Sequence, residues 1–164
     1  MIFVINGKPG CGKDTFANMC VDLLPGKVLN ISTVDYVKAV ATTLGWSGVK
    51  TPENRKFLSD LKKVLTEWED IPYKKVCDQI FMHPKAQVVF IHCREPEEIQ
   101  KFVDRIGAYT LLIQRPTVIS EHQINDSDNN VDNYNYDFTI NNNGSIDDLK
   151  EQAREFLRQF LFNV

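Results

Sequence analysis

The chain has 164 residues, of which 43% are hydrophobic and 25% charged, so it fits one globular domain and argues against wholesale disorder or a fibrous repeat. Nineteen Lys and Arg against 22 Asp and Glu leave a net charge of −3. This balance lacks the basic footprint of a nucleic-acid-binding protein, and any polyanion has to be bound locally. We therefore expect one domain over residues 1–164 with no nucleic-acid partner.

The sequence also lacks the signals of membrane insertion and secretion. No apolar stretch approaches the roughly twenty residues that a membrane helix needs, and residues 1–5 lack a basic leader. We expect a cytoplasmic protein with no membrane partner. The four cysteines form no C-x-x-C pair and no zinc spacing, so four reduced thiols fit better than disulfides or a metal site.

The N-terminal part of the chain predicts a strand, a loop, a helix and a second strand. Residues 2–5 are an apolar run typical of a strand, and residues 16–24 carry apolar side chains at helical spacing. Residues 27–31 predict the second strand. Ser32, with Asp35 three residues later, predicts the N-cap of the next helix.

Two or three helices are predicted before the third strand. Thr51 followed by Pro52 is typical of an N-cap and a first helical position. One face of the helix that follows is apolar: Phe57, Leu58, Leu61, Val64, Leu65 and Trp68. Another helix is predicted from Pro72. Because this segment is longer than a plain crossover requires, residues 45–84 are interpreted as a helical insertion.

The remaining sequence returns to alternating strands and helices. Three further strands are predicted at residues 87–92, 109–114 and 134–140. Helices are predicted from Pro96 and from Ser145, whereas residues 116–133 are polar, lack periodicity and predict a loop. The alternation indicates an α/β protein with a mostly parallel sheet covered on both faces, which binds ligands at the carboxyl ends of its strands.

The most specific motif lies between the first strand and the first helix. Residues 7–13 read G-K-P-G-C-G-K and match G-x-x-x-x-G-K, a loop whose backbone N–H groups cradle phosphates. The start of the helix adds positive charge, and Lys13 can reach the outer phosphates. The sequence therefore predicts a triphosphate site. Its candidate residues are Gly7, Lys8, Pro9, Gly10, Cys11, Gly12, Lys13, Asp14 and Thr15.

Asp14 departs from the usual pattern, which has a Ser or Thr whose hydroxyl binds magnesium. A carboxylate is favourable at a helix N-terminus and can hold Mg²⁺ directly or through water, but without the metal it repels nucleotide phosphates. We predict that Asp14 is a metal ligand and that nucleotide binding depends strictly on magnesium. Thr15 is left to donate its hydroxyl to an inner phosphate.

The pattern G-K-x-x-x-G-K-D-T at residues 7–15 resembles the phosphate loop of phage-type deoxynucleoside monophosphate kinases and animal phosphomevalonate kinases, members of the P-loop kinase superfamily. Shorter similar patterns at residues 32–38, 50–58, 88–98, 107–116 and 137–149 extend the resemblance over most of the chain. It implies a P-loop NTPase fold, a three-layer α/β/α architecture with five strands in the order 2-3-1-4-5. It also implies Mg²⁺-dependent transfer from ATP to a small phosphorylated acceptor, with an acceptor side at residues 45–84 and a lid at residues 116–133.

Under this resemblance, charged residues after the strands become candidates for the reaction. Arg94 could bridge donor and acceptor phosphates, and Arg115 could act from the lid. Arg55 could clamp the acceptor phosphate, Asp35 could orient the acceptor or its magnesium waters, and Lys38 could neutralise charge. The catalytic candidates are Lys13, Arg94, Arg115 and Asp35, and the acceptor-binding candidates are Asp35, Lys38, Arg55 and Arg94. Solvated surface charges, local ion pairs or a helix cap are the alternative interpretations.

Two features depart from the family pattern, and a third resembles it only weakly. His92 stands where relatives often carry an acidic residue two positions before the arginine, which weakens a second metal anchor. Residues 116–133 contain no Lys or Arg, although nucleotide kinase lids commonly contribute arginines. Residues 141–143 resemble the turn that flanks adenine, which makes Asn142 a nucleotide-binding candidate, although a plain turn explains them almost as well.

The favoured hypothesis is a kinase that acts on a nucleoside or deoxynucleoside monophosphate. A second hypothesis keeps the chemistry and changes the acceptor to another phosphorylated metabolite, as in phosphomevalonate kinases. A third is an ATP-binding regulatory module whose catalysis has decayed, which His92 and the uncharged lid favour. A Ras-like GTPase fits poorly because no N-K-x-D motif is present. Both a monomer and a homodimer fit the sequence.

Overall fold

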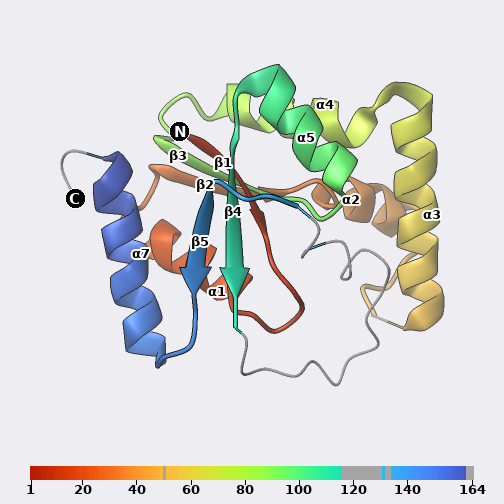
Figure 1. Cartoon of the computed structure of the whole chain (residues 1–164). Helices are drawn as coiled ribbons and strands as arrows, with labels where there is room; N and C mark the ends of the chain where they lie inside the picture. Colours follow the sequence, from red (N-terminus) through yellow and green to blue (C-terminus); the bar gives the residue numbers. More distant parts are fainter. Residues whose placement is uncertain (50, 116–130, 132–133, 162–164) are drawn as a thin grey trace. The chain divides into compact units, whose positions relative to one another are not determined.

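The computed structural model describes residues 1–49, 51–115, 131 and 134–161 (Figure 1). Its strands are β1 (Ile2–Asn6), β2 (Val28–Ser32), β3 (Val88–His92), β4 (Tyr109–Gln114) and β5 (Phe138–Asn141). Its helices are α1 (Lys13–Leu23), α2 (Asp35–Thr43), α3 (Pro52–Glu69), α4 (Ile71–Met82), α5 (Pro96–Ile106) and α7 (Ile146–Phe160). Helices and strands follow each other in the order that the sequence predicts.

The strands form one parallel sheet in the order β2-β3-β1-β4-β5. The central strand β1 places Ile5 opposite His92 of β3 and Asn6 opposite Leu112 of β4. The carboxyl ends of these three strands therefore meet at one edge, where α/β proteins bind ligands. The predicted α/β class and the strand order 2-3-1-4-5 are confirmed.

The chain divides into two compact units. The first comprises residues 1–30 and 85–164, and the second comprises residues 31–84. The predicted helical insertion, residues 45–84, lies within the second unit. The predicted lid lies almost entirely outside the described residues. A single domain over the whole chain stays a prediction.

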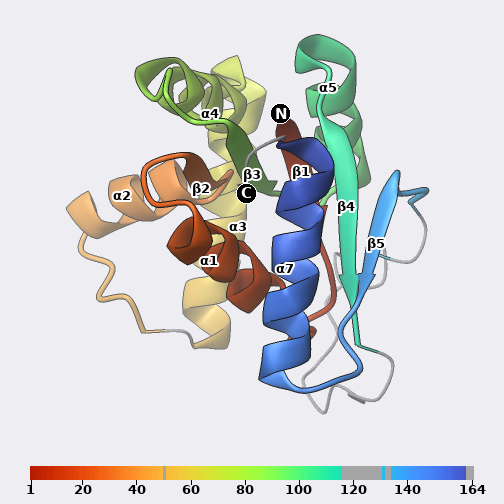
Figure 2. The same ribbon diagram turned by 90° about the vertical axis from the view of Figure 1, so that its left-hand side faces the viewer.

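The core of the first unit lies between the sheet and the helices α1 and α7, which lie side by side (Figure 2). Phe3 of β1 is fully buried there, and its ring centroid lies 5.0 Å from that of Phe156 and 4.9 Å from that of Phe160, both on α7. Val4, whose side chain points to the opposite face of the strand, is equally buried. Burial on both faces explains why β1 is apolar at consecutive positions rather than at alternate ones.

The second unit contains α2, α3 and α4. Thr51 caps α3 as predicted, since its hydroxyl accepts a hydrogen bond from the Asn54 backbone N–H at 3.2 Å. No residue of α3 is buried, however, and Val64 and Trp68 on its apolar face are 59% and 77% exposed. Helical spacing predicted the helix correctly, but spacing alone does not say how completely a face is covered.

Two boundaries differ from the prediction. Ser32 is not the N-cap of α2, because the helix begins at Asp35 and its cap position is Val34. The two predicted partners still form a tight turn, in which the Ser32 backbone N–H donates to the Asp35 carboxylate at 2.8 Å. The last strand begins at Phe138 rather than at residue 134, because Asp137 turns its carboxylate back to accept from the backbone N–H of Thr110 on β4 at 2.8 Å.

Among the described residues, no helix has both the length and the apolar composition required to cross a bilayer.

Candidate active site

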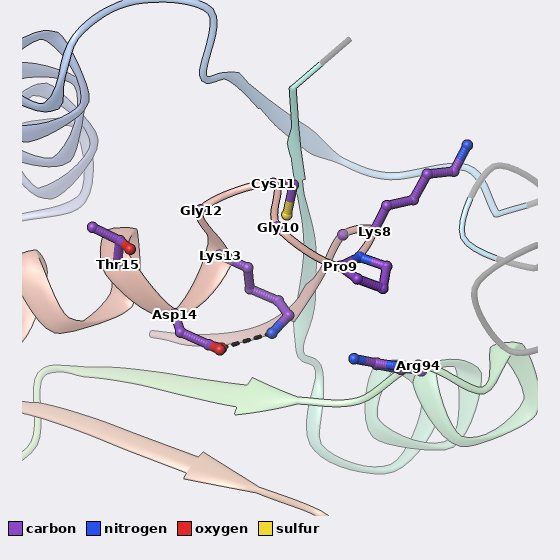
Figure 3. Close-up of a pocket in the computed structure, with 10 residues that line it drawn as sticks. Lys8, Pro9, Gly10, Cys11, Gly12, Lys13, Asp14, Thr15 and Arg94 are labelled. Atoms are coloured by element: carbon purple, nitrogen blue, oxygen red, sulfur yellow. Dashed lines mark hydrogen bonds and ion pairs between the residues drawn. The ribbon is translucent and has the colours of Figure 1, made fainter. Parts of the chain in front are cut away.

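The segment between β1 and α1 encloses a cavity of about 230 Å³ (Figure 3). Its lining residues are Gly7, Lys8, Pro9, Gly10, Cys11, Gly12, Lys13, Asp14, Thr15 and Arg94. Gly12 has a φ of 92°, and a Cβ atom there would collide with the side-chain amide of Asn142. A larger residue at position 12 would therefore be strained and would displace the loop. The structure brings all nine residues of the predicted phosphate loop to one cavity.

Two buried asparagines form hydrogen bonds with the backbone of the loop. The side-chain oxygen of Asn6 accepts from the Gly7 backbone N–H at 2.8 Å, and the side-chain amide of Asn6 donates to the Tyr136 hydroxyl at 2.9 Å. The side-chain amide of Asn142 donates to the Cys11 carbonyl at 2.9 Å. Asn6 is fully buried and Asn142 is 5% exposed. Together they hold the two ends of the loop in place.

This geometry bears on the predicted roles of two loop-associated residues. Asn142 uses its amide on the loop, so its expected contact with adenine stays a prediction. Cys11 is 4% exposed and burial raises the pKa of its thiol, which suits a small packing residue rather than a reactive cysteine. All four cysteines are free, as predicted. No role is assigned to Asn6 from the sequence, in which it follows the apolar run of the first strand. A polar residue at the end of that run, directly before Gly7, was nevertheless a signal that it contacts the loop.

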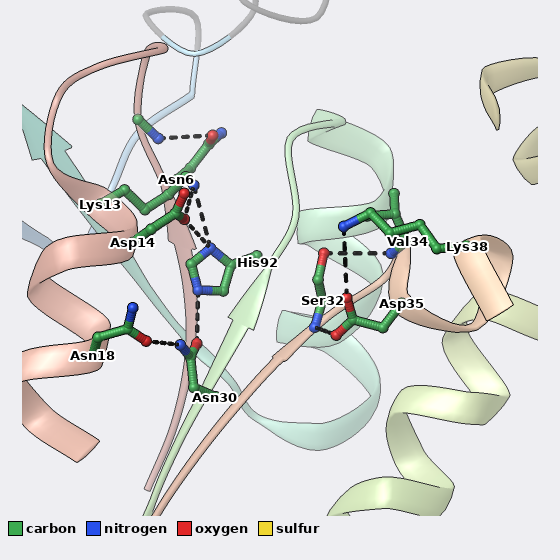
Figure 4. A network of polar contacts seen from close by, with 11 residues as sticks. Asn6, Lys13, Asp14, Asn18, Asn30, Ser32, Val34, Asp35, Lys38 and His92 are labelled. Carbon is green, nitrogen blue, oxygen red and sulfur yellow. Dashed lines mark hydrogen bonds and ion pairs between the residues drawn. The ribbon is translucent and has the colours of Figure 1, made fainter. Parts of the chain in front are cut away.

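Lys13 and Asp14 form an ion pair at the mouth of the loop. The Lys13 ammonium lies 2.7 Å from Asp14 Oδ1 and 3.3 Å from His92 Nδ1 (Figure 4). The other ring nitrogen of His92 lies 2.7 Å from Asn30 Oδ1, and Asn30 in turn donates to Asn18 Oδ1 at 3.1 Å. The sequence predicts Lys13 and Asp14 as site residues and shows His92 only as a departure from the family. It gives no signal for the two asparagines, because they lie outside the loop motif in the sequence.

Electrostatics favour an ionised Asp14. Partial burial by itself would raise the pKa of its carboxyl, but the hydrogen bond and charge of Lys13, with His92 and Arg94 nearby, hold the pKa below its usual value. The Asp14 side chain is 78% exposed, whereas that of Lys13 is 13% exposed. The carboxylate is thus open to solvent while the ammonium is held in place.

The donor set of the loop fits Mg²⁺ only in combination with a bound phosphate. The described residues contain no group of three His, Cys, Asp or Glu that could hold a metal ion by themselves. Mg²⁺ commonly keeps several waters and takes one or two carboxylates together with substrate phosphates. The exposed carboxylate of Asp14, with the hydroxyl of Thr15 beside the same cavity, meets that requirement.

The predicted arginines fall in different places. Arg94 follows β3 and lines the cavity (Figure 3). Its neighbour Cys93 is buried and its thiol donates to Glu98 at 3.2 Å, which anchors the segment that carries Arg94. Arg115 is exposed directly after β4. Contacts of either guanidinium with phosphates stay predictions, and the predicted lid that follows Arg115 lies almost entirely outside the described residues.

The predicted acceptor-side residues belong to the second unit. Lys38 Nζ lies 3.9 Å from Asp35 Oδ1, and Asp35 also accepts from the Ser32 backbone (Figure 4). Arg55 is exposed on the first turn of α3. The structure brings Asp35 and Lys38 together. This arrangement fits the alternative interpretation, a local cap with a surface ion pair, as well as it fits an acceptor site. Their roles in binding an acceptor, and that of Arg55, stay predictions.

Comparison with known proteins gives a fold but no close relative. No family model matches the sequence, and no curated protein matches it either. The structure is similar to the dephospho-CoA kinase from Campylobacter jejuni, with a TM-score of 0.55 and 15% identity over 97% of this chain and 96% of that chain. It is also similar to the shikimate kinase from Aquifex aeolicus, with a TM-score of 0.51 and 14% identity over 100% of both chains.

A third similar structure is the thymidylate kinase from Ehrlichia chaffeensis, with a TM-score of 0.51 and 12% identity over 96% of this chain and 98% of that chain. Identities this low establish a common architecture rather than a common substrate. With the predicted phosphate loop at the carboxyl end of the central strand, the chain has the fold of the small-molecule P-loop kinases.

Proposed function

We propose that the protein transfers the γ-phosphoryl group of ATP to a small phosphorylated acceptor, and that this acceptor is a nucleoside or deoxynucleoside monophosphate. The observation that carries the proposal is the loop cavity, in which glycine-rich backbone, Lys13 and Arg94 surround one space. Phosphoryl transfer requires little covalent chemistry from a protein. It depends on positioning and on positive charge around the transferred group, and this cavity supplies both.

The backbone of the cavity and three of its charged side chains have roles in this proposal. Backbone N–H groups of the loop and the N-terminus of α1 bind the β- and γ-phosphates of ATP. Lys13 moves its ammonium from Asp14 to the outer phosphate, and Arg94 bridges the phosphates of donor and acceptor. Asp14 would hold Mg²⁺, which supplies charge neutralisation at the phosphates when it is bound.

The nucleotide acceptor is supported by two independent likenesses. The sequence patterns at residues 7–15 and downstream resemble those of deoxynucleoside monophosphate kinases. One of the similar solved structures is a thymidylate kinase, whereas two others are named as a dephospho-CoA kinase and a shikimate kinase. The identity of the acceptor is thus the more specific claim of the proposal, and phosphoryl transfer from ATP is the more general one.

A panel assay tests both parts. ADP release from ATP and Mg²⁺ is measured with each ribo- and deoxyribonucleoside monophosphate, and separately with dephospho-CoA, shikimate and phosphomevalonate. We expect one or a few monophosphates to raise ADP release well above the acceptor-free rate. Lys13→Ala should abolish the increase, whereas Lys85→Ala, an exposed lysine outside the cavity, should not.

The outcomes separate the two parts of the proposal. ADP release that only a non-nucleotide acceptor stimulates would overturn the nucleotide acceptor and keep the kinase. Tight binding of Mg-ATP without transfer to any acceptor would overturn the kinase and favour a regulatory ATP-binding module.

A further inference from the structure

A line of polar side chains runs from α1 across β2 to the end of β3 and meets the phosphate loop (Figure 4). Asn30 Nδ2 donates to Asn18 Oδ1, so the oxygen of Asn30 is the atom that faces His92 Nε2 at 2.7 Å. A carbonyl oxygen only accepts hydrogen bonds, and Nε2 must therefore carry the proton. In a neutral imidazole the second nitrogen, Nδ1, then presents a lone pair.

That lone pair faces a cation. Lys13 Nζ lies 3.3 Å from His92 Nδ1 and 2.7 Å from Asp14 Oδ1, and Nδ1 itself lies 3.3 Å from the same carboxylate oxygen. The ammonium thus lies within hydrogen-bond distance of one ring nitrogen and one carboxylate oxygen. The His92 side chain is 14% exposed, so its ring has little freedom to leave the ammonium once Asn30 fixes its orientation.

We propose that His92 is a positioning residue for Lys13, oriented by Asn30 and Asn18, and that it holds the ammonium ready without a second negative charge. This inference rests on the proposed function. Among the described residues, Asp14 is the carboxylate within ion-pair distance of Lys13. A neutral imidazole binds an ammonium less strongly than a carboxylate does. Lys13 can therefore move to the phosphates of ATP at a lower electrostatic cost than if a second carboxylate held it, and its side chain is still ordered beforehand.

The chain offers a matched set of variants. An Asn side chain carries its amide oxygen at the level of Nδ1, so His92→Asn keeps an acceptor for Lys13. A Gln side chain reaches the level of Nε2, so His92→Gln keeps the contact with Asn30 and loses the acceptor. His92→Leu loses both contacts and keeps most of the volume.

The first measurement is the affinity for Mg-ATP, which needs no acceptor and therefore stands even if no acceptor is ever phosphorylated. We expect His92→Leu and His92→Gln to weaken ATP binding by about tenfold, because a long Lys13 side chain that is no longer held in place must be ordered when the nucleotide binds, and His92→Asn to stay near the wild-type affinity. Equal affinities for all four proteins would overturn the proposal. So would a loss in His92→Asn as large as that in His92→Leu.

The second measurement is the protonation of the ring in nucleotide-free protein. Nitrogen chemical shifts of His92, recorded at a pH well above the ordinary histidine pKa, should report the tautomer with the proton on Nε2, and Asn30→Ala should reduce its preference. The opposite tautomer in the wild-type protein would overturn the proposal, because a protonated Nδ1 cannot accept from Lys13. Where an active acceptor is found, His92→Leu should raise KM for ATP more than it lowers kcat, whereas a general loss of folding would remove active protein without changing KM.

Discussion

At the N-terminus of α1, the neighbouring residues Lys13 and Asp14 carry opposite charges and determine the electrostatic potential that an anion would encounter at the loop. The Lys13 ammonium is held by Asp14 and His92, and its side chain is largely shielded from solvent. Asp14 is largely exposed, and its pKa, held below the usual value for an aspartate, leaves it ionised near neutral pH. A triphosphate that approaches the loop without a metal therefore meets a full negative charge beside its cation.

Replacing Asp14 should change the magnesium dependence of ATP binding. We expect Asp14→Ser to bind metal-free ATP about fivefold more tightly, because it removes roughly 1 kcal/mol of repulsion between solvent-screened charges. Its gain in affinity on adding Mg²⁺ should shrink, which calorimetric titration with and without Mg²⁺ measures. Asp22→Ser, on the same helix outside the cavity, is the control, and an unchanged magnesium dependence in Asp14→Ser would contradict the role of this carboxylate.

Asn142 offers a second test at the scale of one side chain. Asn142→Ala removes the donor to the buried Cys11 carbonyl and should destabilise the fold by about 1–3 kcal/mol, the cost of an unsatisfied buried group. It should also weaken ATP and GTP binding to the same extent, because it loosens the loop rather than a base contact. The exposed neighbour Asn143 supplies the control Asn143→Ala. Selective loss of ATP binding alone would instead favour the predicted contact with adenine.

At the scale of elements, α7 shows how local sequence and packing combine. Its N-terminus has a full capping box, in which the Ser145 hydroxyl accepts from the Asp148 backbone and the Asp148 carboxylate accepts from the Ser145 backbone at 2.8 Å. One face of this helix buries Leu149, Phe156 and Leu157 against the sheet. The cap defines where the helix begins, and the aromatic core defines which side faces inward.

Ser145→Ala should lower the free energy of unfolding by about 1 kcal/mol. Hydrogen bonds from the Ser145 side chain and backbone lower the pKa of Asp148. A carboxyl with a lowered folded-state pKa contributes stability above its ordinary pKa, and that contribution is lost as the pH falls through the lowered value. The difference in unfolding between wild type and variant should therefore be constant near neutral pH and decrease in acid. Chemical denaturation at several pH values measures it, with the exposed mid-helix variant Ser59→Ala on α3 as control; a difference that grows in acid would contradict the capping role.

At the scale of the whole molecule, apolar burial is unevenly divided between the two units. The sheet of the first unit contains fully buried side chains on consecutive positions of β1 and β3, whereas α3 of the second unit contains no buried residue. The stability of a segment against local opening follows the apolar surface that it buries. The two units should therefore differ in how often their hydrogen bonds open.

Hydrogen exchange tests this difference. Backbone amides in the middle of α3 should exchange at least about tenfold faster than those of β1 and β3, because their helix opens without disrupting a buried core. Mass spectrometry of peptides from residues 56–66 and 2–6 measures the two rates. Equal protection of both segments would mean that α3 buries its apolar face in solution, and would contradict the uneven division.

Much of the architecture and the outline of the site follow from the sequence. Strand and helix periodicity predicted every described element in order, and the resemblance to P-loop kinases supplied the strand order 2-3-1-4-5 that the structure confirms. The glycines and Lys13 predicted the loop, because its conformation depends on residues that are adjacent in the chain. Local signals of this kind are complete within a short segment, so the amino-acid sequence by itself determined them.

What only the tertiary structure decided are contacts between residues far apart in the chain. Asn142 supports Cys11 across 131 positions, Asn6 meets Tyr136 across 130, and His92 meets Asn30 across 62. None of these pairs has a local pattern, since each partner is brought to the loop by the register of strands and the packing of helices rather than by its neighbours. The chain alone predicted a glycine-rich loop suited to phosphate, and folding specified which side chains contact that loop and its lysine.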